Sequence, residues 1–331
     1  MRIVNNVQDA WIQILYDLKN VYDNKIESRI GECKEIINYS IRIENPIDRL
    51  IMIPERKMNY AYNFAEFCWI MSGDNGINIL EKFNKRMASY SDNGVTLSGA
   101  YGSRLLDYWG QILYKLKNEK NSRQLVMPIF NGQDLKITTK DTPCTISFQF
   151  IERNNYLNMI VNMRSNDAWL GFPYDAFTFT AIQELLALTA GLKVGKYYHN
   201  SGSMHLYSNN YEDANEILKQ KMEYSIKDRF VILMDSTLTV EKIKEFWYGL
   251  IKYDDYDAKD FYSIRASVID LINDDTVSDF EKMMKIIMIE YRNRKINNFF
   301  QYEFNDDFGF NNKLNKIHSL MENFLKKEYK I

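Results

Sequence analysis

Cys144 is the residue of this sequence whose type offers nucleophilic chemistry most directly. It stands in the segment TPC (142–144), after a proline and between two predicted strands. An activated thiolate forms a covalent intermediate that divides one difficult step into two easier ones. A free cysteine is also commonly a small, inert core residue, and from composition alone this second interpretation is favoured.

Three arginines are candidate anion ligands. Arg29 and Arg123 lie in turn-like segments, and Arg164 ends a predicted strand. Guanidinium groups hold phosphate through paired hydrogen bonds, and a guanidinium beside a thiol lowers the pKa of that thiol. Each arginine alone is more simply a solvated surface residue, and the spacing does not show that the three converge.

The segment RSNDAWLGFPYDAF (164–177) places Asp175 in surroundings that are predicted to be buried. A buried carboxylate without a partner is costly, so we expect Asp175 to have one. The partner is either a ligand or the protein backbone. In the second case Asp175 would be the N-cap of a helix that is predicted to begin at Ala176, because Asp is a favoured N-cap residue.

Periodicity predicts the elements that position these residues. Apolar residues at helical spacing predict helices at 7–23, 59–72, 103–119 and 176–191. Alternating or apolar runs predict strands at 34–44, 123–130, 145–152, 156–164, 202–210 and 229–235. From about residue 237 onward the sequence is densely charged with helical periodicity. We therefore predict a core at 1–236 and a helical C-terminal extension at 237–331, packed on that core.

The composition is that of an ordinary globular protein. Of 331 residues, 46% are hydrophobic and 26% are charged, and the net charge is −2. This charge gives no bulk attraction to nucleic acid or membrane, and no apolar run is long enough to cross a bilayer. Three widely spaced cysteines, three histidines without metal-ligand spacing and no signal-peptide pattern predict a cytoplasmic protein without a metal site.

Several segments, taken in order, resemble the thymidylate synthase superfamily. The most specific are TPCTISFQF, RSNDAWLGFPYDAF and GLKVGKYYHNSGSMHLYSNN, and the others are SRIG, EFCWIMSGDN, GAYG and NSRQL. The order of so many segments carries much of the weight, and the resemblance covers roughly residues 5–235. It implies an α/β (α+β) fold of the thymidylate synthase type, with a mixed, twisted sheet flanked by helices.

The resemblance also implies a role for each residue that matches a family motif. Cys144 would add to C6 of a pyrimidine nucleoside monophosphate, and Glu66 and Tyr101 would organise water and proton transfer around the base. The implied phosphate ligands are Arg29, Arg164 and Ser165, with Arg123 donated by the partner subunit of a homodimer. The implied sugar contacts are His205 and Tyr207, and the implied folate contacts are Asp167, Leu170 and Gly171.

The reaction that the resemblance implies requires these residue types. Thiolate addition at C6 makes C5 of the pyrimidine nucleophilic, so that C5 attacks the methylene carbon of the co-substrate 5,10-methylenetetrahydrofolate. Removal of the C5 proton then needs a base or a relayed water. The phosphate ligands supply binding energy that orients the reacting carbon.

Asp175 is the most informative departure from the family pattern. Synthases that act on dUMP resemble this chain but have an asparagine there, whose amide accepts from N3–H and donates to O4 of uracil. An ionised Asp175 cannot donate, but it can accept from the exocyclic amine of cytosine. The same exchange is seen in the cytidylate hydroxymethylases of the superfamily. Further departures replace the usual histidine, glutamine, arginine and aspartate, respectively, by Thr145, Met163, Gln124 and Ser203.

We therefore predict C5-hydroxymethylation of a cytidine monophosphate through a covalent adduct of Cys144. The long chain favours CMP over dCMP, although the sequence does not identify a residue that faces C2′. One alternative is methylation of dUMP or UMP in the manner of a thymidylate synthase. Another is an inactive nucleotide- or RNA-binding regulator, against which the intact Cys144, Arg164 and Glu66 argue.

Overall fold

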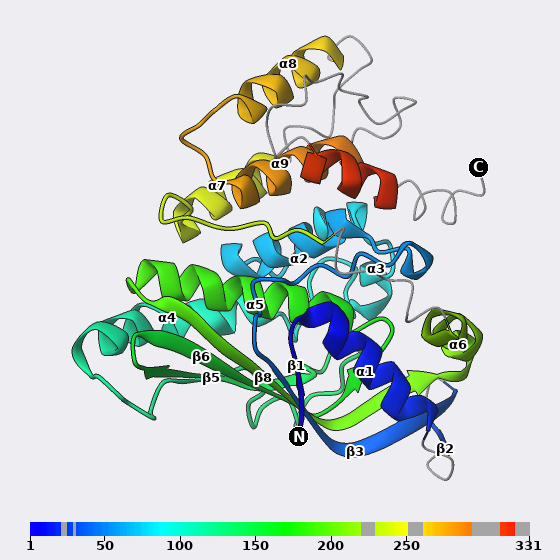
Figure 1. Cartoon of the computed structure of the whole chain (residues 1–331). Helices are drawn as coiled ribbons and strands as arrows, with labels where there is room; N and C mark the ends of the chain where they lie inside the picture. Colours follow the sequence, from blue (N-terminus) through cyan, green and yellow to red (C-terminus); the bar gives the residue numbers. More distant parts are fainter. Residues whose placement is uncertain (21–24, 29–30, 220–228, 251–260, 293–311, 322–331) are drawn as a thin grey trace. The chain divides into compact units, whose positions relative to one another are not determined.

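The structure of the chain is a computed structural model that describes residues 1–20, 25–28, 31–219, 229–250, 261–292 and 312–321. The chain divides into two compact units. The first comprises residues 1–56, 104–138 and 142–231, and the second comprises residues 57–103, 139–141 and 232–331. The first unit contains the sheet, and the second is helical (Figure 1).

One eight-stranded mixed sheet runs through the first unit. Six strands follow one another in the order β1 (Arg2–Val4), β3 (Glu32–Ile43), β8 (Lys193–Tyr207), β6 (Tyr156–Met163), β5 (Thr145–Arg153) and β4 (Val126–Pro128). The short strands β2 (Lys25–Glu27) and β7 (Asn166–Asp167) pair with β3 and β8. The pairs β1–β3, β6–β8 and β7–β8 are parallel, and the other pairs are antiparallel.

Helices α1 (Val7–Lys19) and α5 (Phe172–Thr189) cover one face of this sheet (Figure 1). Alternate residues of β6 are buried there, because side chains of a strand point to opposite faces in turn. Phe148 of β5 meets Phe179 of α5 with ring centroids 4.8 Å apart. Asn6 caps α1 by accepting from the amide of Asp9 at 2.9 Å, a contact worth about 1 kcal/mol.

The other face carries a row of half-exposed polar side chains that crosses four strands. The Ser40 hydroxyl donates to Asn200 Oδ1 at 2.9 Å, and Asn200 Nδ2 donates to Asn162 Oδ1 at 3.1 Å. Asn162 Nδ2 in turn donates to Ser147 Oγ at 3.2 Å. We call these four residues the polar ladder. A sheet face with such a row of polar side chains can be exposed to solvent or can contact another protein surface.

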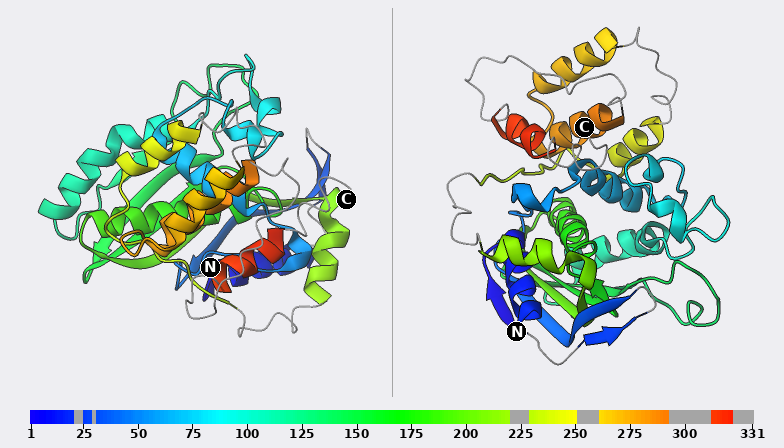
Figure 2. Two further views of the ribbon diagram at one scale, coloured as in Figure 1. Left: turned by 90° about the horizontal axis from the view of Figure 1, so that it is seen from above. Right: turned by 90° about the vertical axis from the view of Figure 1, so that its right-hand side faces the viewer.

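The helical second unit is organised around α2 (Tyr60–Ser72), which is buried almost throughout its length. It packs against α7 (Val240–Gly249) and α9 (Asp279–Arg292), which Figure 2 shows from two further sides. Phe280 of α9 meets Phe64 and Phe67 of α2 at 5.4 and 5.5 Å between ring centroids. The remaining described helices include α3 (Met87–Tyr90), the first residues of α4 (Tyr101–Asn118), α8 (Phe261–Ile272) and residues 312–321.

Three expectations about the elements need correction, and one is not tested. Helix α5 begins at Phe172 rather than Ala176, and β8 begins at Lys193 rather than residue 202. Residues 229–235 form no strand, although Ile232 and Met234 are buried as an alternating pattern predicts. The division into a core at 1–236 and an extension at 237–331 stays a prediction. No helix among the described residues has the length and hydropathy that a membrane span requires.

Candidate active site

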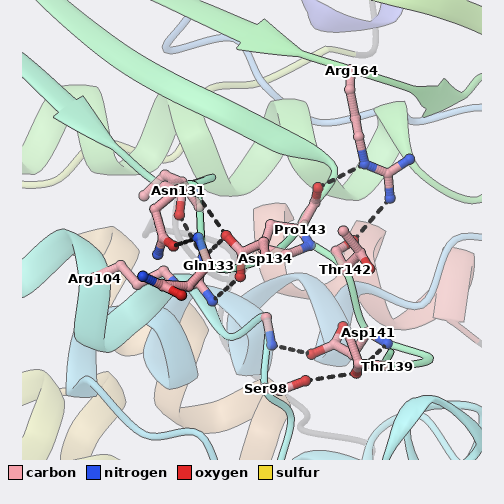
Figure 3. Close-up of polar contacts among 12 residues, drawn as sticks. Ser98, Arg104, Asn131, Gln133, Asp134, Thr139, Asp141, Thr142, Pro143 and Arg164 are labelled. Atoms are coloured by element: carbon pink, nitrogen blue, oxygen red, sulfur yellow. Dashed lines mark hydrogen bonds and ion pairs between the residues drawn. The ribbon is translucent and has the colours of Figure 1, made fainter. Parts of the chain in front are cut away.

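Cys144 and Arg164 lie side by side in the first unit, at adjacent strand ends. The amide of Arg164 donates to the carbonyl of Cys144 at 2.8 Å. The guanidinium of Arg164 donates through Nε to the carbonyl of Pro143 and through Nη2 to that of Thr142, both at 2.9 Å (Figure 3). Cys144 itself is half-buried. Arg164 therefore fixes the backbone that presents the thiol, a role that sequence reasoning did not predict.

The guanidinium of Arg164 retains a capacity to bind an anion. It has five N–H donors, and the two carbonyl bonds occupy only part of this set. The Arg164 side chain is exposed, and β8 runs close to its backbone. A Cβ at Gly202 would lie 2.9 Å from the Arg164 carbonyl oxygen, so this approach requires a glycine. The predicted role of Arg164 as a phosphate ligand is compatible with this geometry and stays a prediction.

His205 and Tyr207, the predicted sugar contacts, lie near the end of β8 with their rings 5.1 Å apart and nearly perpendicular. His205 is 8% exposed. Within the described part of the chain, its Nδ1 is buried and has no hydrogen-bond partner. A buried polar atom left unsatisfied is costly, so this nitrogen suits a ligand hydroxyl.

A carboxylate that sequence reasoning missed lies beside these residues. Glu35 of β3 is directly opposite His205 in the antiparallel register. Its Oε1 accepts a hydrogen bond of 2.5 Å from the hydroxyl of Ser203, two residues before His205. We call Glu35, Ser203, His205 and Tyr207 the Glu35 cluster.

The predicted folate residues form a tight turn between β7 and α5. Asp167 Oδ1 accepts from the amides of Trp169 and Leu170 at 2.7 and 3.2 Å. Leu170 is 41% exposed, so its side chain is accessible to a flat apolar ring. Gly171 has a packing role, because a Cβ there would lie only 2.7 Å from Asn166 Nδ2. The absence of a side chain at Gly171 thus leaves room for the Asn166 amide.

Asn166 is a protein partner of Asp175. Asn166 Nδ2 donates to Asp175 Oδ2 at 2.6 Å. Because α5 begins at Phe172, Asp175 lies within its first turns and is not the N-cap, which corrects that alternative. Asn166 Oδ1 lies 3.0 Å from His199 Nε2, and His199 Nδ1 lies 2.9 Å from the Tyr197 hydroxyl. We call these four residues the Asp175 cluster.

The hydrogen bonds of the Asp175 cluster run in one direction. Complete burial lowers the pKa of His199 to about 3, so its ring is neutral and carries one N–H. Asn166 Oδ1 can only accept, which places that proton on Nε2 and makes Nδ1 the acceptor of the Tyr197 hydroxyl. The donors therefore point from Tyr197 through His199 and Asn166 to Asp175. Burial and the Asp175 carboxylate raise the pKa of Tyr197, which keeps the hydroxyl protonated.

For three further residues that are predicted to bind the phosphate, the structure gives only their location or leaves them outside the described residues. Arg123 is exposed in the segment before β4, and Ser165 is half-buried between Arg164 and β7. Arg29 lies outside the described residues. Their predicted roles at the phosphate stay predictions.

Glu66 and Tyr101 belong to the second unit. The Tyr62 hydroxyl donates to Glu66 Oε1 at 2.8 Å, which orients the carboxylate on α2. The start of α4 lies against α2, because a Cβ at Gly102 would be 2.5 Å from the carbonyl oxygen of Ile70. Just before Tyr101, the amide of Gly99 donates to Asp141 Oδ2 at 2.7 Å (Figure 3). Both predicted proton-transfer residues thus lie in locally fixed segments.

The sequence model of thymidylate synthase matches residues 13–268, which is most of the chain. The chain belongs to the thymidylate synthase family. Two relatives are named deoxyuridylate hydroxymethyltransferase. The one from Bacillus phage SP01 is 30% identical over 251 residues, which cover 66% of either protein. The one from Pseudomonas phage M6 is 32% identical over 214 residues, which cover 61% of this chain and 60% of that protein. The matched regions thus span less than two thirds of either phage enzyme.

Two further similarities are to one thymidylate synthase sequence and to one thymidylate synthase structure. The thymidylate synthase of Bacillus subtilis subsp. natto is 24% identical over 271 residues, which cover 78% of this chain and 87% of that enzyme. The crystal structure of thymidylate synthase from T4 phage superposes with a TM-score of 0.55 and 22% identity, over 62% of this chain and 80% of that one. The latter likeness confirms the predicted fold, a mixed twisted sheet flanked by helices.

Proposed function

We propose that this chain is a cytoplasmic enzyme that transfers a hydroxymethyl group to C5 of a cytidine monophosphate. The one-carbon donor would be 5,10-methylenetetrahydrofolate, and water would supply the hydroxyl oxygen. Membership of the thymidylate synthase family supports one-carbon transfer to a pyrimidine nucleotide. The choice of cytosine rests on one observation, the direction of the hydrogen bonds that end at Asp175.

These bonds favour a donor on the edge of the base. Asn166 donates to Asp175 Oδ2, so the carboxylate is held as an acceptor by a neutral, buried relay. The exocyclic amine of cytosine donates to such a group, and N3 pairs with it when protonated. Uracil offers N3–H as a donor, but it also presents the O4 lone pairs, which an ionised carboxylate repels. Discrimination by a hydrogen-bonding group of this kind is large, because the wrong base leaves polar groups unpaired.

The proposed roles of the chain's own residues follow the geometry. The Cys144 thiolate forms a bond to C6 of the base, and C5 becomes nucleophilic. Arg164 holds the Cys144 loop through the carbonyls of Thr142 and Pro143, and its outward donors face the phosphate. Glu66, oriented by Tyr62, assists removal of the C5 proton through water. Expulsion of Cys144 from C6 at the end restores the ring.

The folate co-substrate fits the turn at residues 167–171. When bound, it supplies a carbon at the oxidation level of formaldehyde. The exposed Leu170 side chain suits its apolar rings, and Asp167 presents a carboxylate that the turn already orients. The balance is simple: C5 loses a proton, tetrahydrofolate is released, and water adds to the methylene carbon left on the base. The proposal includes no metal.

Deoxyuridylate is a second candidate substrate. Two relatives carry the name deoxyuridylate hydroxymethyltransferase. The reaction at C5 would be the same, and only the base-reading contact and the sugar would differ. For uracil, Asp175 could accept from N3–H, but an ionised carboxylate could not donate to O4.

Exchange of tritium from C5 of a labelled cytidylate tests the covalent step. Cys144→Ser removes the thiolate and should abolish tritium release, with the fold retained because the change is small. Cys68→Ala is a control, since Cys68 is buried against Met284 and has no proposed role in the chemistry. Release at the wild-type rate from Cys144→Ser would remove Cys144 from the mechanism.

We also propose a homodimer in which Arg123 reaches the site of the partner. The polar ladder on the sheet face opposite α1 and α5 offers a surface that a second copy can cover, and Arg123 is exposed. Light scattering should give twice the mass of the chain. Mixing inactive Arg123→Ala with inactive Cys144→Ser should restore activity, because one site of the mixed dimer is intact. A fully active monomer would contradict the proposal.

A further inference from the structure

The Glu35 cluster places a carboxylate and an unsatisfied imidazole nitrogen on one face of the sheet. Residues opposite each other in an antiparallel pair share a face, and Glu35 is opposite His205. Ser203 and Tyr207 share that face with His205, because alternate residues of β8 point the same way. The Ser203 hydroxyl donates to Glu35 Oε1 at 2.5 Å, and the rings of His205 and Tyr207 lie 5.1 Å apart on the same face.

This arrangement suits a pair of hydroxyl groups. A carboxylate has about four lone-pair sites, and Ser203 uses one of those on Glu35. His205 Nδ1 is buried and, among the described residues, has no hydrogen-bond partner. A vicinal diol can donate to the carboxylate with one hydroxyl and pair with the imidazole through the other. Carboxylates bind ribose in this way in other nucleotide sites, where an acidic residue accepts from the 2′-hydroxyl.

The local charge excludes a phosphate from this place. Burial raises the pKa of the Cys33 thiol, and the carboxylates of Glu35 and Asp167 raise it further. Cys33 is opposite Tyr207, and Asp167 is in register with His205, so the region around the cluster is electronegative. Neutral hydroxyl donors are favoured there, whereas an anion is repelled.

We infer that Glu35, supported by Ser203, accepts the 2′-hydroxyl of the nucleotide and selects ribose over deoxyribose. This inference rests on the proposed function, since it assumes that His205 contacts the sugar. Ser203 stands where the family resemblance leads one to expect an aspartate. In this chain the carboxylate comes instead from the neighbouring strand, and Glu35 is a specificity-determining residue that sequence reasoning did not identify.

Calorimetric binding of CMP and dCMP to the full chain tests this assignment. The wild-type protein should bind CMP roughly tenfold to a hundredfold more tightly than dCMP, the usual range for a hydrogen bond to a charged group. Glu35→Leu should bring the affinity ratio close to one by weakening CMP alone. Glu35→Gln keeps the size and one acceptor oxygen, so its ratio should lie between the two. Glu32→Gln is the matched control, because Glu32 points to the opposite face of β3 and pairs with the exposed Lys25 at 2.9 Å.

The outcomes separate this inference from the function on which it rests. A wild-type ratio near one, or a ratio that both Glu35 variants leave unchanged while the nucleotides still bind, overturns the inference alone. An equal loss for CMP and dCMP in both variants assigns Glu35 a structural role and also overturns it. If none of CMP, dCMP, UMP and dUMP binds, the proposed function fails and the inference falls with it.

Discussion

The Asp175 cluster and the Glu35 cluster each contain a carboxylate to which we assign a ligand contact, but the two carboxylates have very different support from the protein. Behind Asp175 stand three buried residues, with Asn166 at 3% exposure and His199 and Tyr197 at 0%. Behind Glu35 stands one half-exposed serine. A carboxylate supported by a buried network has one orientation, whereas a carboxylate held near the surface can change its orientation. We therefore expect strict recognition of the base and graded recognition of the sugar.

Replacement of Asp175 should give the largest effect. Asp175→Asn removes the charge and restores a donor for O4, so kcat/KM for cytidylate should fall roughly a hundredfold or more. Tritium exchange on uridylate should become measurable. The gain is expected to be modest, because Thr145 and Met163 also differ from the family pattern. The surface variant Asp107→Asn serves as control, and an unchanged cytidine preference in Asp175→Asn would show that this residue does not read the base.

Interrupting the relay should have a smaller effect on the same quantity. His199→Leu removes the N–H group that Asn166 Oδ1 accepts from. The Asn166 amide can then rotate, and its Nδ2 no longer has to donate to Asp175. The ratio of cytidylate to uridylate exchange should fall about tenfold, in line with one lost buried hydrogen bond. A purely structural role for His199 would lower both rates equally and leave this ratio where it was.

The buried imidazole should also make stability depend on pH. The folded-state pKa of His199 is about 3, below the value of about 6.5 in an unfolded chain. Below about pH 6.5, His199 therefore binds a proton in the unfolded state but not in the folded state. The free energy of unfolding falls as the pH falls below this value. Between pH 6.5 and 4.5 the slope from this group approaches about 1.4 kcal/mol per pH unit. Urea unfolding of wild type and His199→Gln should give a shallower slope for the variant, and equal slopes would refute a neutral, buried His199.

The smallest effect should come from the support of Glu35. Ser203→Ala removes one hydrogen bond and leaves the carboxylate in place. The CMP-to-dCMP affinity ratio should fall by about threefold, which is a smaller fall than the one expected for either Glu35 substitution. A larger effect for Ser203→Ala than for Glu35→Leu would reverse the proposed order and make Ser203 the primary contact.

The sequence predicted those features that depend on local pattern. Alternation along residues 145–152 and 156–164 predicted β5 and β6 almost to the residue, and the helix predicted at 59–72 is α2, which ends before Gly73. The order of motifs placed Cys144 and Arg164 in one family site, and the structure brings them together through a backbone bond. Their chemical roles stay predictions that the experiments above address.

The supporting residues were missed because strand register is not a local property. His199 and Asn166 are 33 residues apart, and Ser203 and Glu35 are 168 apart. The pattern predicted a strand only from residue 202, which left His199 outside β8 altogether. The start of α5 was predicted too late, at Ala176, which made Asp175 a candidate N-cap. Pro173 indicates a start near Phe172, because proline is favoured in the first turn of a helix.

The most direct test of the central claim is the product formed by the wild-type enzyme. The full chain is incubated with 5,10-methylenetetrahydrofolate and, separately, with CMP, dCMP, UMP and dUMP, and each product is weighed by mass spectrometry. We predict that a cytidine nucleotide gains one CH₂O unit, CMP faster than dCMP, without formation of dihydrofolate. A gain of one CH₂ unit with dihydrofolate, or conversion of dUMP in preference to both cytidine nucleotides, would contradict the assignment.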